Sequence, residues 1–299
     1  MSALARIRIL RAAPLTTVQD AGRFGALAYG MAASGPMDAF GWAEVGGASS
    51  GIEFTRTGLE FELVEGAATA GFGGGAFELR INDRKRKWPG NANLKAGDRV
   101  AVTPGAAGNY GYVRFSGDID VPLVTGSRAT NTIAGLGGRE GRPLRPGDEL
   151  DLIAGASEPE SSVSPLPPGE APFRFIWGLH GDLFDAAERN GFISKPFVIS
   201  HRLDRMGVRL EDRHGVFASA QHLSLVSDSV VPGDVQILGD GTPIVLMRDH
   251  QPTGGYPRIA TLLGDDISRF AQMRPGSEVR FEPVSLDRAA AKRRKGRAS

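Results

Sequence analysis

Glycine and proline interrupt this chain at frequent intervals, and their spacing limits the fold more than any other feature. Forty-one glycines and nineteen prolines are spread over 299 residues. The segments between them are short and apolar, as at residues 61–64, 100–102, 110–115, 173–176 and 244–247. Because short apolar runs bounded by turn residues are typical of strands, the sequence predicts a mainly β protein.

Few stretches have the character of a helix. We expect short helices over residues 37–45, 183–189 and 267–273. The second is expected to end at Asn190-Gly191, because glycine readily adopts the backbone conformation that follows a helix. The third is expected to begin at Asp265 and Asp266, whose carboxylates can accept hydrogen bonds from the first free N–H groups.

Three segments echo one another, and each combines a turn with a strand. They are "LKAGDRVAV" (94–102), "LRPGDELDL" (144–152) and "MRPGSEVRF" (273–281). In each, glycine occupies a turn position that needs a positive φ, and an alternating strand follows. Two of the segments close successive predicted β units, which favours two related barrel-like halves. Chance reuse of a common turn-to-strand device explains the echo equally well.

The stretch "SEPESSVSPLPPGEAP" has no apolar periodicity and is rich in serine and proline. Such composition is typical of a linker, which we place at residues 157–172. The prediction is therefore an N-terminal domain over 1–156 and a C-terminal domain over 173–284. The basic residues 285–299 are expected to form a disordered tail. A nucleic-acid-binding arm is the alternative, but nothing else in the chain supplies a basic face.

Charge and cysteine content exclude several classes of function. Lysine plus arginine (35) nearly equals aspartate plus glutamate (34), so no overall field attracts nucleic acid or an anionic membrane. The absence of cysteine excludes disulfides and thiolate chemistry. No signal peptide and no apolar run of membrane-spanning length is evident, so we expect a cytoplasmic protein. Its expected partners are proteins and small molecules.

Several familiar motifs are present only in part. "GASSG" (47–51) fits a nucleophile elbow around Ser49, but no buried strand leads into it, and a flexible loop explains it better. "GFGGGAFE" (71–78) lacks the Lys-Ser/Thr of a phosphate loop and is better explained as a glycine-rich β turn. The five histidines show no metal-ligand spacing, so no metal site is expected. No ATP signature and no Met-Lys-Met biotin site occurs, so ATP or biotin chemistry must come from another polypeptide.

Three polar clusters lie among glycines at predicted strand ends, where a backbone can approach a ligand closely. Salt bridges that merely tie loops together are the alternative explanation for each. The proposed substrate-binding residues of the first two clusters are Thr17, Gln19, Asp20, Arg23, Asp38, Ser200 and Arg205. Those of the third are Gln251, Thr253 and Tyr256, beside three candidate catalytic residues, Asp249, His250 and Arg258.

Taken together, these stretches resemble the family known as allophanate hydrolase subunit 2, KipA or the C subunit of 5-oxoprolinase, which is related to the carboxyltransferase part of urea carboxylase. The resemblance covers about residues 9–284. It is carried by "TTVQDAGRFG", "GPMD", "GDIDVPLVTGSRAT", "GLGGREGRPLRPGD", "SHRLDRMGVRLE", "VVPGDVQI" and "DHQPTGGYPRIATLLGDDISRFAQMRPGSEVRF".

The resemblance implies two cyclophilin-like β-barrel domains with a few short helices. It also implies a KipI-like partner, which corresponds to the B subunit of 5-oxoprolinase, with the A subunit or a biotin carboxylase as a possible further partner. Family members take part in ATP-dependent opening of 5-oxoproline or in carboxyl transfer from carboxybiotin to an amide nitrogen. The expected substrate is a small amide or lactam. No cofactor is expected to be bound covalently, since partner proteins would supply ATP or carboxybiotin.

Amide or lactam chemistry develops negative charge, which positioned hydrogen bonds stabilise. Arg205 and Arg258 are the candidates for binding an anionic group, because a guanidinium matches a carboxylate or phosphate in a bidentate way. Asp249 and His250 are candidates to hold or move a proton. Tyr256 and Thr253 would orient the substrate.

The sequence departs from the family pattern at three places. "WAEVGGASSGIEF" (42–54) is shortened and lacks both asparagines of the usual "A-N-x-L-V-G-N" helix. Arginine replaces a small polar residue in "SHRLDRMG", and "DHQ" stands where "DRQ" is common. These changes bear on the first cluster, on partner docking and on substrate choice. The competing hypothesis from another class is a non-catalytic, KipA-like regulator that antagonises a KipI-like kinase inhibitor.

Overall fold

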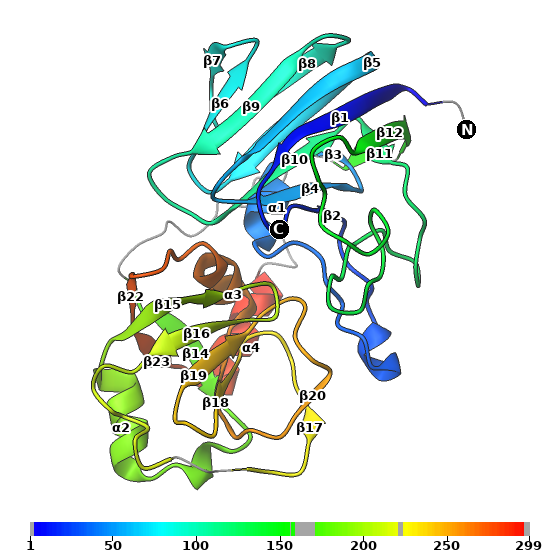
Figure 1. The fold of residues 1–299 in the computed structure, drawn as a ribbon. Coiled ribbons are helices and arrows are strands. Elements are labelled where there is room, and N and C mark those ends of the chain that lie inside the picture. Colours follow the sequence, from blue (N-terminus) through cyan, green and yellow to red (C-terminus); the bar gives the residue numbers. More distant parts are fainter. Residues whose placement is uncertain (1–2, 156, 159–170, 221–223, 296–299) are drawn as a thin grey trace. The chain divides into compact units, whose positions relative to one another are not determined.

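This computed structural model describes residues 3–155, 157–158, 171–220 and 224–295. The chain divides into two compact units, Met1–Pro165 and Leu166–Ser299. Each is built on a β-sheet that curls into a nearly closed barrel, and α-helices are few and short (Figure 1). The predicted mainly β fold with two barrel-like units is therefore confirmed.

The sheet of the first unit is organised by one long strand, β5 (Leu59–Gly74). Its first half pairs with β1 (Ala5–Ala12) and β9 (Arg99–Pro104), and its second half with β8 (Gly90–Lys95) and β10 (Tyr110–Phe115). The other strands of this unit are β2 (Thr17–Gln19), β3 (Gly47–Ala48), β4 (Gly51–Thr55), β6 (Phe77–Ile81), β7 (Arg84–Arg86), β11 (Gly117–Ile119), β12 (Glu149–Ala154) and β13 (Ser157–Glu158).

The core of the first unit follows from alternation along these strands. In β6 the side chains of Phe77, Leu79 and Ile81 point inward and the two residues between them face solvent. Strand β10 is buried at all six positions, because neighbouring strands flank it on both sides and other elements cover it. Period-two alternation places one face of each strand in a shared apolar interior.

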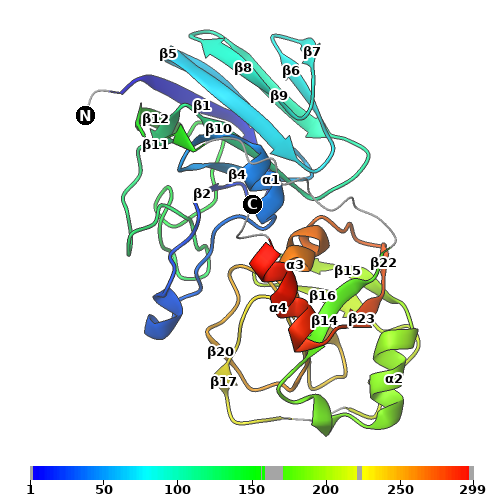
Figure 2. The same cartoon turned by 180° about the vertical axis from the view of Figure 1, so that it is seen from behind.

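The second unit holds an eight-stranded sheet in the order β22-β15-β16-β19-β18-β21-β14-β23. All neighbours are antiparallel except β14 and β23. Helix α2 packs against β23 and α3 against β14 (Figure 2). The strands are β14 (Phe173–Trp177), β15 (Phe197–Leu203), β16 (Gly207–Glu211), β18 (Asp234–Ile237), β19 (Pro243–Leu246), β21 (Arg258–Leu262), β22 (Glu278–Val279) and β23 (Phe281–Pro283), with β17 (Asp228–Ser229) paired to β20 (Thr253–Gly254).

The three predicted helices exist, but their ends differ from the expectation. They are α1 (Ala39–Glu44), α2 (Ala186–Ser194) and α3 (Gly264–Ala271), and two single turns, Ala26–Tyr29 and Gly181–Leu183, are 3-10 helices. Helix α2 begins three residues late, because Asp185 and Glu188 form a capping box. It also continues through Asn190-Gly191, since Gly191 packs closely on Val216, where a Cβ would lie 2.7 Å from Cγ1.

The predicted cap of α3 is wrong. Leu263 occupies the cap position, and Asp265 and Asp266 lie in the first helical turn. Asp266 is buried, where its carboxylate accepts from Arg174 Nε at 2.7 Å and from Arg269 Nη2 at 3.0 Å. The side chain is therefore committed to an ion-pair network, which the local sequence pattern could not reveal.

Two further expectations concern the ends of the domains. The boundary between the units falls inside the segment predicted as a linker, most of which lies outside the described residues. Ser157 and Glu158, expected to begin the linker, instead pair as β13 with β3 of the first unit. The expected disordered tail contains helix α4 (Leu286–Lys295), whose alanine, lysine and arginine residues are strong helix formers.

The three echoing turns are confirmed in detail. Gly97, Gly147 and Gly276 have φ values of 89°, 91° and 88° and precede β9, β12 and β22. A side chain at any of the three would meet no atom within 4 Å. The requirement for glycine is therefore one of backbone conformation alone, because L-residues are strained at positive φ.

We predict that Gly276→Ala lowers the free energy of unfolding of the second unit by about 1–2 kcal/mol, the cost of forcing an alanine to positive φ. Gly264→Ala is the matched control, since its added methyl group also meets no atom within 4 Å and its φ is not in the positive region. Denaturant unfolding of the full chain measures both. Equal effects of the two substitutions would contradict the conformational explanation.

Candidate functional site

Arg258 lies at the end of the polar stretch that follows β19. It is buried at the start of β21, where Nη1 donates to the Ser229 carbonyl at 2.8 Å and Nη2 to Asp228 Oδ2 at 2.5 Å. Nη1 also lies 3.6 Å from Asp234 Oδ2. We call Arg258, Asp228 and Asp234 the Arg258 cluster. Its two carboxylates hold the guanidinium in one orientation.

The two acids of the Arg258 cluster differ in exposure. The Asp228 side chain is 48% exposed, whereas that of Asp234 is 1% exposed. The backbone N–H of Ser229, followed by the charge of Arg258, lowers the pKa of Asp228, so it stays ionised. Asp234 is fixed by hydrogen bonds from Thr261 Oγ1 at 2.6 Å and from the Val231 N–H at 3.0 Å. Only Asp228 can move away from Arg258 without leaving a buried charge unpaired.

Two histidines lie in this region with different ring tautomers. His250 is 3% exposed, and its Nδ1 lies 2.6 Å from the Gln251 carbonyl. A carbonyl only accepts, so Nδ1 carries the proton and Nε2 the lone pair. Burial lowers the pKa of His250, which is therefore neutral at pH 7. The Nδ1 of His180 instead accepts from the Arg258 N–H at 3.3 Å, and burial followed by the charge of Arg258 lowers its pKa.

Arg205 and Asp249 form a closed, buried pair. Arg205 Nε donates to Asp249 Oδ2 at 2.8 Å and Nη2 donates to Oδ1 at 3.1 Å, in a bidentate arrangement. Their side chains are 2% and 0% exposed. The Asp249 N–H also donates to the Arg205 carbonyl at 2.7 Å. The structure therefore brings these two predicted site residues together, but as partners of each other that fix the turn leading to His250.

The remaining residues of the third polar cluster surround Gln236. Gln251 Nε2 donates to Gln236 Oε1 and Gln236 Nε2 to the Tyr256 carbonyl, both at 3.3 Å. Gly254 packs closely on this network, and a Cβ there would lie 2.5 Å from Gln236 Nε2, so a larger residue would displace the Gln236 side chain. Thr253 is exposed and Tyr256 is 41% exposed. These two side chains are available to a ligand.

The first polar cluster is buried and internally bonded. Asp38 caps α1 by accepting from the N–H groups of Phe40 and Gly41, both at 3.0 Å. The other four members join the loop after β2 to residues 127–130. They do so through Gln19 Nε2 to Thr17 Oγ1 (2.9 Å) and to the Thr130 carbonyl (3.1 Å), Ser127 Oγ to Asp20 Oδ1 (2.6 Å), Arg128 N to Asp20 Oδ2 (2.5 Å) and Arg23 Nη2 to the Ala129 carbonyl.

Ser49, the residue at the nucleophile position of "GASSG", is hydrogen-bonded to an acid. Its Oγ donates to Asp118 Oδ1 at 2.8 Å, and Ser50 donates to the same oxygen through N and Oγ. The segment lies between β3 and β4, so the strand-to-helix turn of a nucleophile elbow is not formed.

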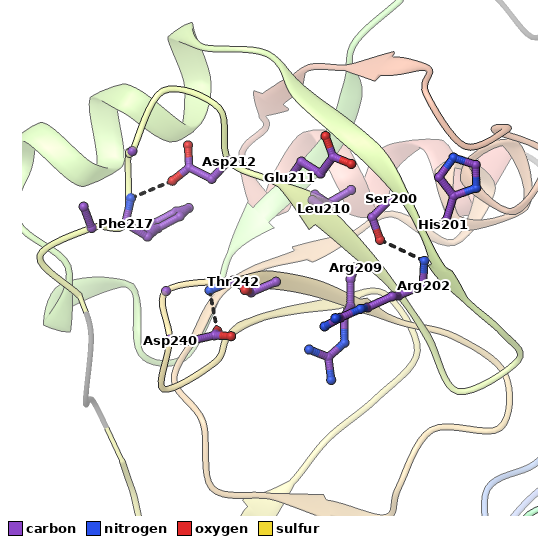
Figure 3. Close-up of a pocket in the computed structure, with 13 residues that line it drawn as sticks. Ser200, His201, Arg202, Arg209, Leu210, Glu211, Asp212, Phe217, Asp240 and Thr242 are labelled. Carbon is purple, nitrogen blue, oxygen red and sulfur yellow. Dashed lines mark hydrogen bonds between the residues drawn. The ribbon is translucent and has the colours of Figure 1, made fainter.

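Ser200 lies apart from the rest of the predicted site, in a pocket of the second unit. The pocket has a volume of about 550 Å³ and is lined by residues of β15, β16, the loop after β16 and the turn between β18 and β19 (Figure 3). Asp249, His250 and Arg258 are not among its lining residues. The second predicted cluster is thus divided between this pocket and the buried pair of Arg205.

Sequence reasoning missed Asp234, Asp228 and His180. A signal for Asp234 was present, since "VVPGDVQI" places one acid at the start of a short strand with two apolar residues, and this strand proves fully buried. A buried acid needs a partner, and Arg258 is that partner. Nothing near Asp228 or His180 in the sequence indicated that they approach a residue 30 and 78 positions away.

Metal-binding clusters and membrane-spanning helices are both absent from the residues that the structure describes. No group of three or more histidine, aspartate or glutamate side chains is placed to hold a metal ion there. Among the same residues, no helix combines the length and the apolar character needed to cross a membrane.

Comparison with known proteins gives a consistent result. Residues 29–283 match the family described as carboxyltransferase domain, subdomain A and B. The chain is 34% identical to the C subunit of 5-oxoprolinase from Escherichia coli K12, over 95% of this chain and 93% of that protein. It is 29% identical to urea amidolyase of Lachancea kluyveri, over 90% of this chain but 16% of that protein. The crystal structure of Kluyveromyces lactis urea carboxylase superposes with a TM-score of 0.85 at 26% identity, covering 97% of this chain and 28% of that one.

The buried pair generates a prediction about stability. Asp249→Ala leaves the Arg205 guanidinium buried without its carboxylate, so we expect a loss of about 3–5 kcal/mol in the free energy of unfolding. The double substitution Arg205→Met with Asp249→Leu removes both charges, and we expect it to lose far less. Denaturant unfolding compares them. Equal losses would mean that packing volume, rather than charge, holds this turn.

The lowered pKa of His250 generates a prediction about pH. Below about pH 6.5 the unfolded chain takes up a proton that the folded chain binds more weakly, so the free energy of unfolding falls as the pH falls. The slope from one such group is at most about 1.4 kcal/mol per pH unit. In His250→Asn the amide can still donate to the Gln251 carbonyl but does not titrate. Between about pH 7.5 and about pH 5.5, the free energy of unfolding should fall more steeply with falling pH for the wild type than for His250→Asn. Equal slopes would refute the assignment of a lowered pKa to His250.

Proposed function

The chain belongs to the carboxyltransferase domain family, subdomains A and B, and on this premise we propose that it serves as the C subunit of an ATP-dependent 5-oxoprolinase or of a related biotin-dependent, carboxyltransferase-like complex. The observation that carries the proposal is the match to the C subunit of 5-oxoprolinase, which extends over nearly the full length of both proteins. The urea amidolyase match covers a small part of a much longer protein. The identity to the 5-oxoprolinase subunit (34%) is also higher than that to the urea amidolyase (29%), which favours a role of the 5-oxoprolinase type.

The Arg258 cluster gives the proposal a chemical basis. An anionic group of a substrate can replace the exposed carboxylate of Asp228 on the guanidinium, while Asp234 keeps Arg258 in place. The cation is oriented before the substrate arrives, so little reorganisation is needed when charge develops on an amide or lactam oxygen. Thr253 and Tyr256 are exposed nearby in the chain and would contact the rest of the molecule.

His250 is the residue best suited to move a proton. Its neutral ring, with the proton fixed on Nδ1, leaves a lone pair on Nε2 that can accept a proton at neutral pH. Asp249 supports this role indirectly, because its pair with Arg205 fixes the turn that precedes His250. We therefore propose Arg258 and His250 as the reacting groups and Asp249 as a positioning residue.

Other polypeptides would complete the reaction. ATP or carboxybiotin, held by partner proteins, would supply the activated phosphoryl or carboxyl group. The proposed partners are a KipI-like protein, equivalent to the B subunit of 5-oxoprolinase, and either the A subunit of that enzyme or a biotin carboxylase, in a cytoplasmic complex. This chain would contribute the grip on the anionic group and the proton acceptor.

The test is an activity assay of the co-expressed subunits, which measures ATP-dependent release of glutamate from 5-oxoproline with and without a biotin carrier. We predict that Arg258→Lys lowers kcat/KM about 10- to 100-fold, because lysine keeps the charge but loses the bidentate hydrogen bonds. Arg213→Lys, at an exposed ion pair of the same unit, is the matched control.

Wild-type turnover by Arg258→Lys would reject the site assignment. Co-purification with a KipI-like protein, without lactamase or carboxyltransferase activity under any condition, would favour the KipA-like regulator in place of an enzyme component.

A further inference from the structure

The pocket that contains Ser200 is built from neighbouring antiparallel strands. Ser200, His201 and Arg202 come from β15, and Arg209 and Glu211 from β16. The register of this pair shifts between Ile199 and Leu203, so Arg202 lies in the irregular stretch of β15 that faces Arg209 of β16. The buried residues Leu210 and Phe217 also line the pocket. The pocket is therefore lined by both polar and apolar side chains.

Arg202 and Arg209 are two like charges on neighbouring strands that line the same pocket. Both side chains extend over the pocket (Figure 3). The structure gives neither guanidinium a hydrogen bond or an ion pair within 4.0 Å to another described residue. Two like charges that line one pocket repel each other when no carboxylate lies between them. An arrangement that costs stability and leaves the donors of two guanidinium groups unused indicates a function outside the fold.

The acids around the pocket are already occupied. Glu211 accepts from Arg213 Nη2 at 2.8 Å, and Asp212 accepts from the Phe217 N–H at 2.9 Å. Asp240 accepts from the Thr242 N–H at 2.9 Å. This hydrogen bond lowers the pKa of Asp240, and the charge of Arg209 lowers it to a smaller extent. These carboxylates have partners of their own, so the two arginines keep donors for a ligand.

We propose that this pocket is an anion-binding site that takes a small molecule bearing a carboxylate or phosphate group, gripped between Arg202 and Arg209. Guanidinium groups match both kinds of oxyanion through paired N–H donors. The volume of about 550 Å³ lies within the usual range for small-molecule sites. Asp240 and Thr242, on the turn between β18 and β19, face the rest of the ligand with acceptors.

This site shares no residue with the Arg258 cluster and does not depend on the proposed function. Binding here can be measured on the purified chain without partner proteins or turnover. Failure of the anion site would leave the activity prediction for Arg258 untouched, and failure of that prediction would leave the anion site untouched.

The experiment titrates the full chain with inorganic phosphate and, separately, with glutarate, by calorimetry at constant ionic strength set with sodium chloride. We expect Arg202→Gln and Arg209→Gln each to weaken binding at least about tenfold. Lys195→Gln removes the same charge from an exposed position outside the pocket, and its binding should equal that of the wild type. Tighter binding of one probe identifies the preferred oxyanion.

Thermal unfolding adds a readout that a purely structural role would not produce. Without an anion, Arg202→Gln should unfold at a higher temperature than the wild type, because the repulsion between the arginines is gone. Adding the bound probe should raise the midpoint of the wild type but not that of the variant. The proposal is overturned if neither probe binds more tightly to the wild type than to Arg209→Gln, or if Lys195→Gln loses as much affinity as the two arginine variants.

Discussion

Burial of arginine is the constraint on which much of this structure depends. Arg23, Arg114 and Arg205 are among the largest side chains that the fold buries completely. A guanidinium carries five N–H donors and stays charged, so its burial requires acceptors in fixed places. Each of these residues therefore determines the path of a loop that is distant in sequence.

Arg114 illustrates how a buried cation fixes a short segment. Its guanidinium donates to the carbonyls of Val45 (2.7 Å) and Ala48 (2.8 Å) and lies 4.8 Å from the ring centroid of Trp42. These carbonyls belong to the shortened segment after Asp38. The short helix α1 is held at its start by the Asp38 cap and beyond its end by Arg114, so the segment is fixed although it is brief.

The same principle separates structural arginines from available ones. Arg205 is matched by one buried carboxylate, which closes it to a ligand. Arg258 is paired with one buried and one exposed carboxylate, so a ligand could displace the exposed one. Arg202 and Arg209 have no such partner among the residues that the structure describes, and they face a pocket. The described part of the second unit therefore contains fully paired, partly paired and unpaired arginine side chains.

Local pattern and tertiary contact contributed differently to what could be predicted. The strands at residues 100–102 and 110–115 were evident, because short apolar runs and the turn residues that bound them act over a few residues. The end of α2 was not evident from the sequence, because it depends on Val216, which packs on Gly191 from a distant loop. The division of the predicted site was not evident either, since the sequence places Arg205, Asp249 and Arg258 in similar polar surroundings.

By itself, the sequence determined the mainly β fold, the positive-φ turns at Gly97, Gly147 and Gly276, and the family. These depend on backbone conformation and short-range periodicity, which neighbouring residues set. Only the tertiary structure decided which charged residues serve the fold and which are open to a ligand. Arg205 and Asp249 are 44 positions apart and Arg258 and Asp228 are 30 apart. Whether a charge is neutralised depends on which distant group the folded chain brings against it.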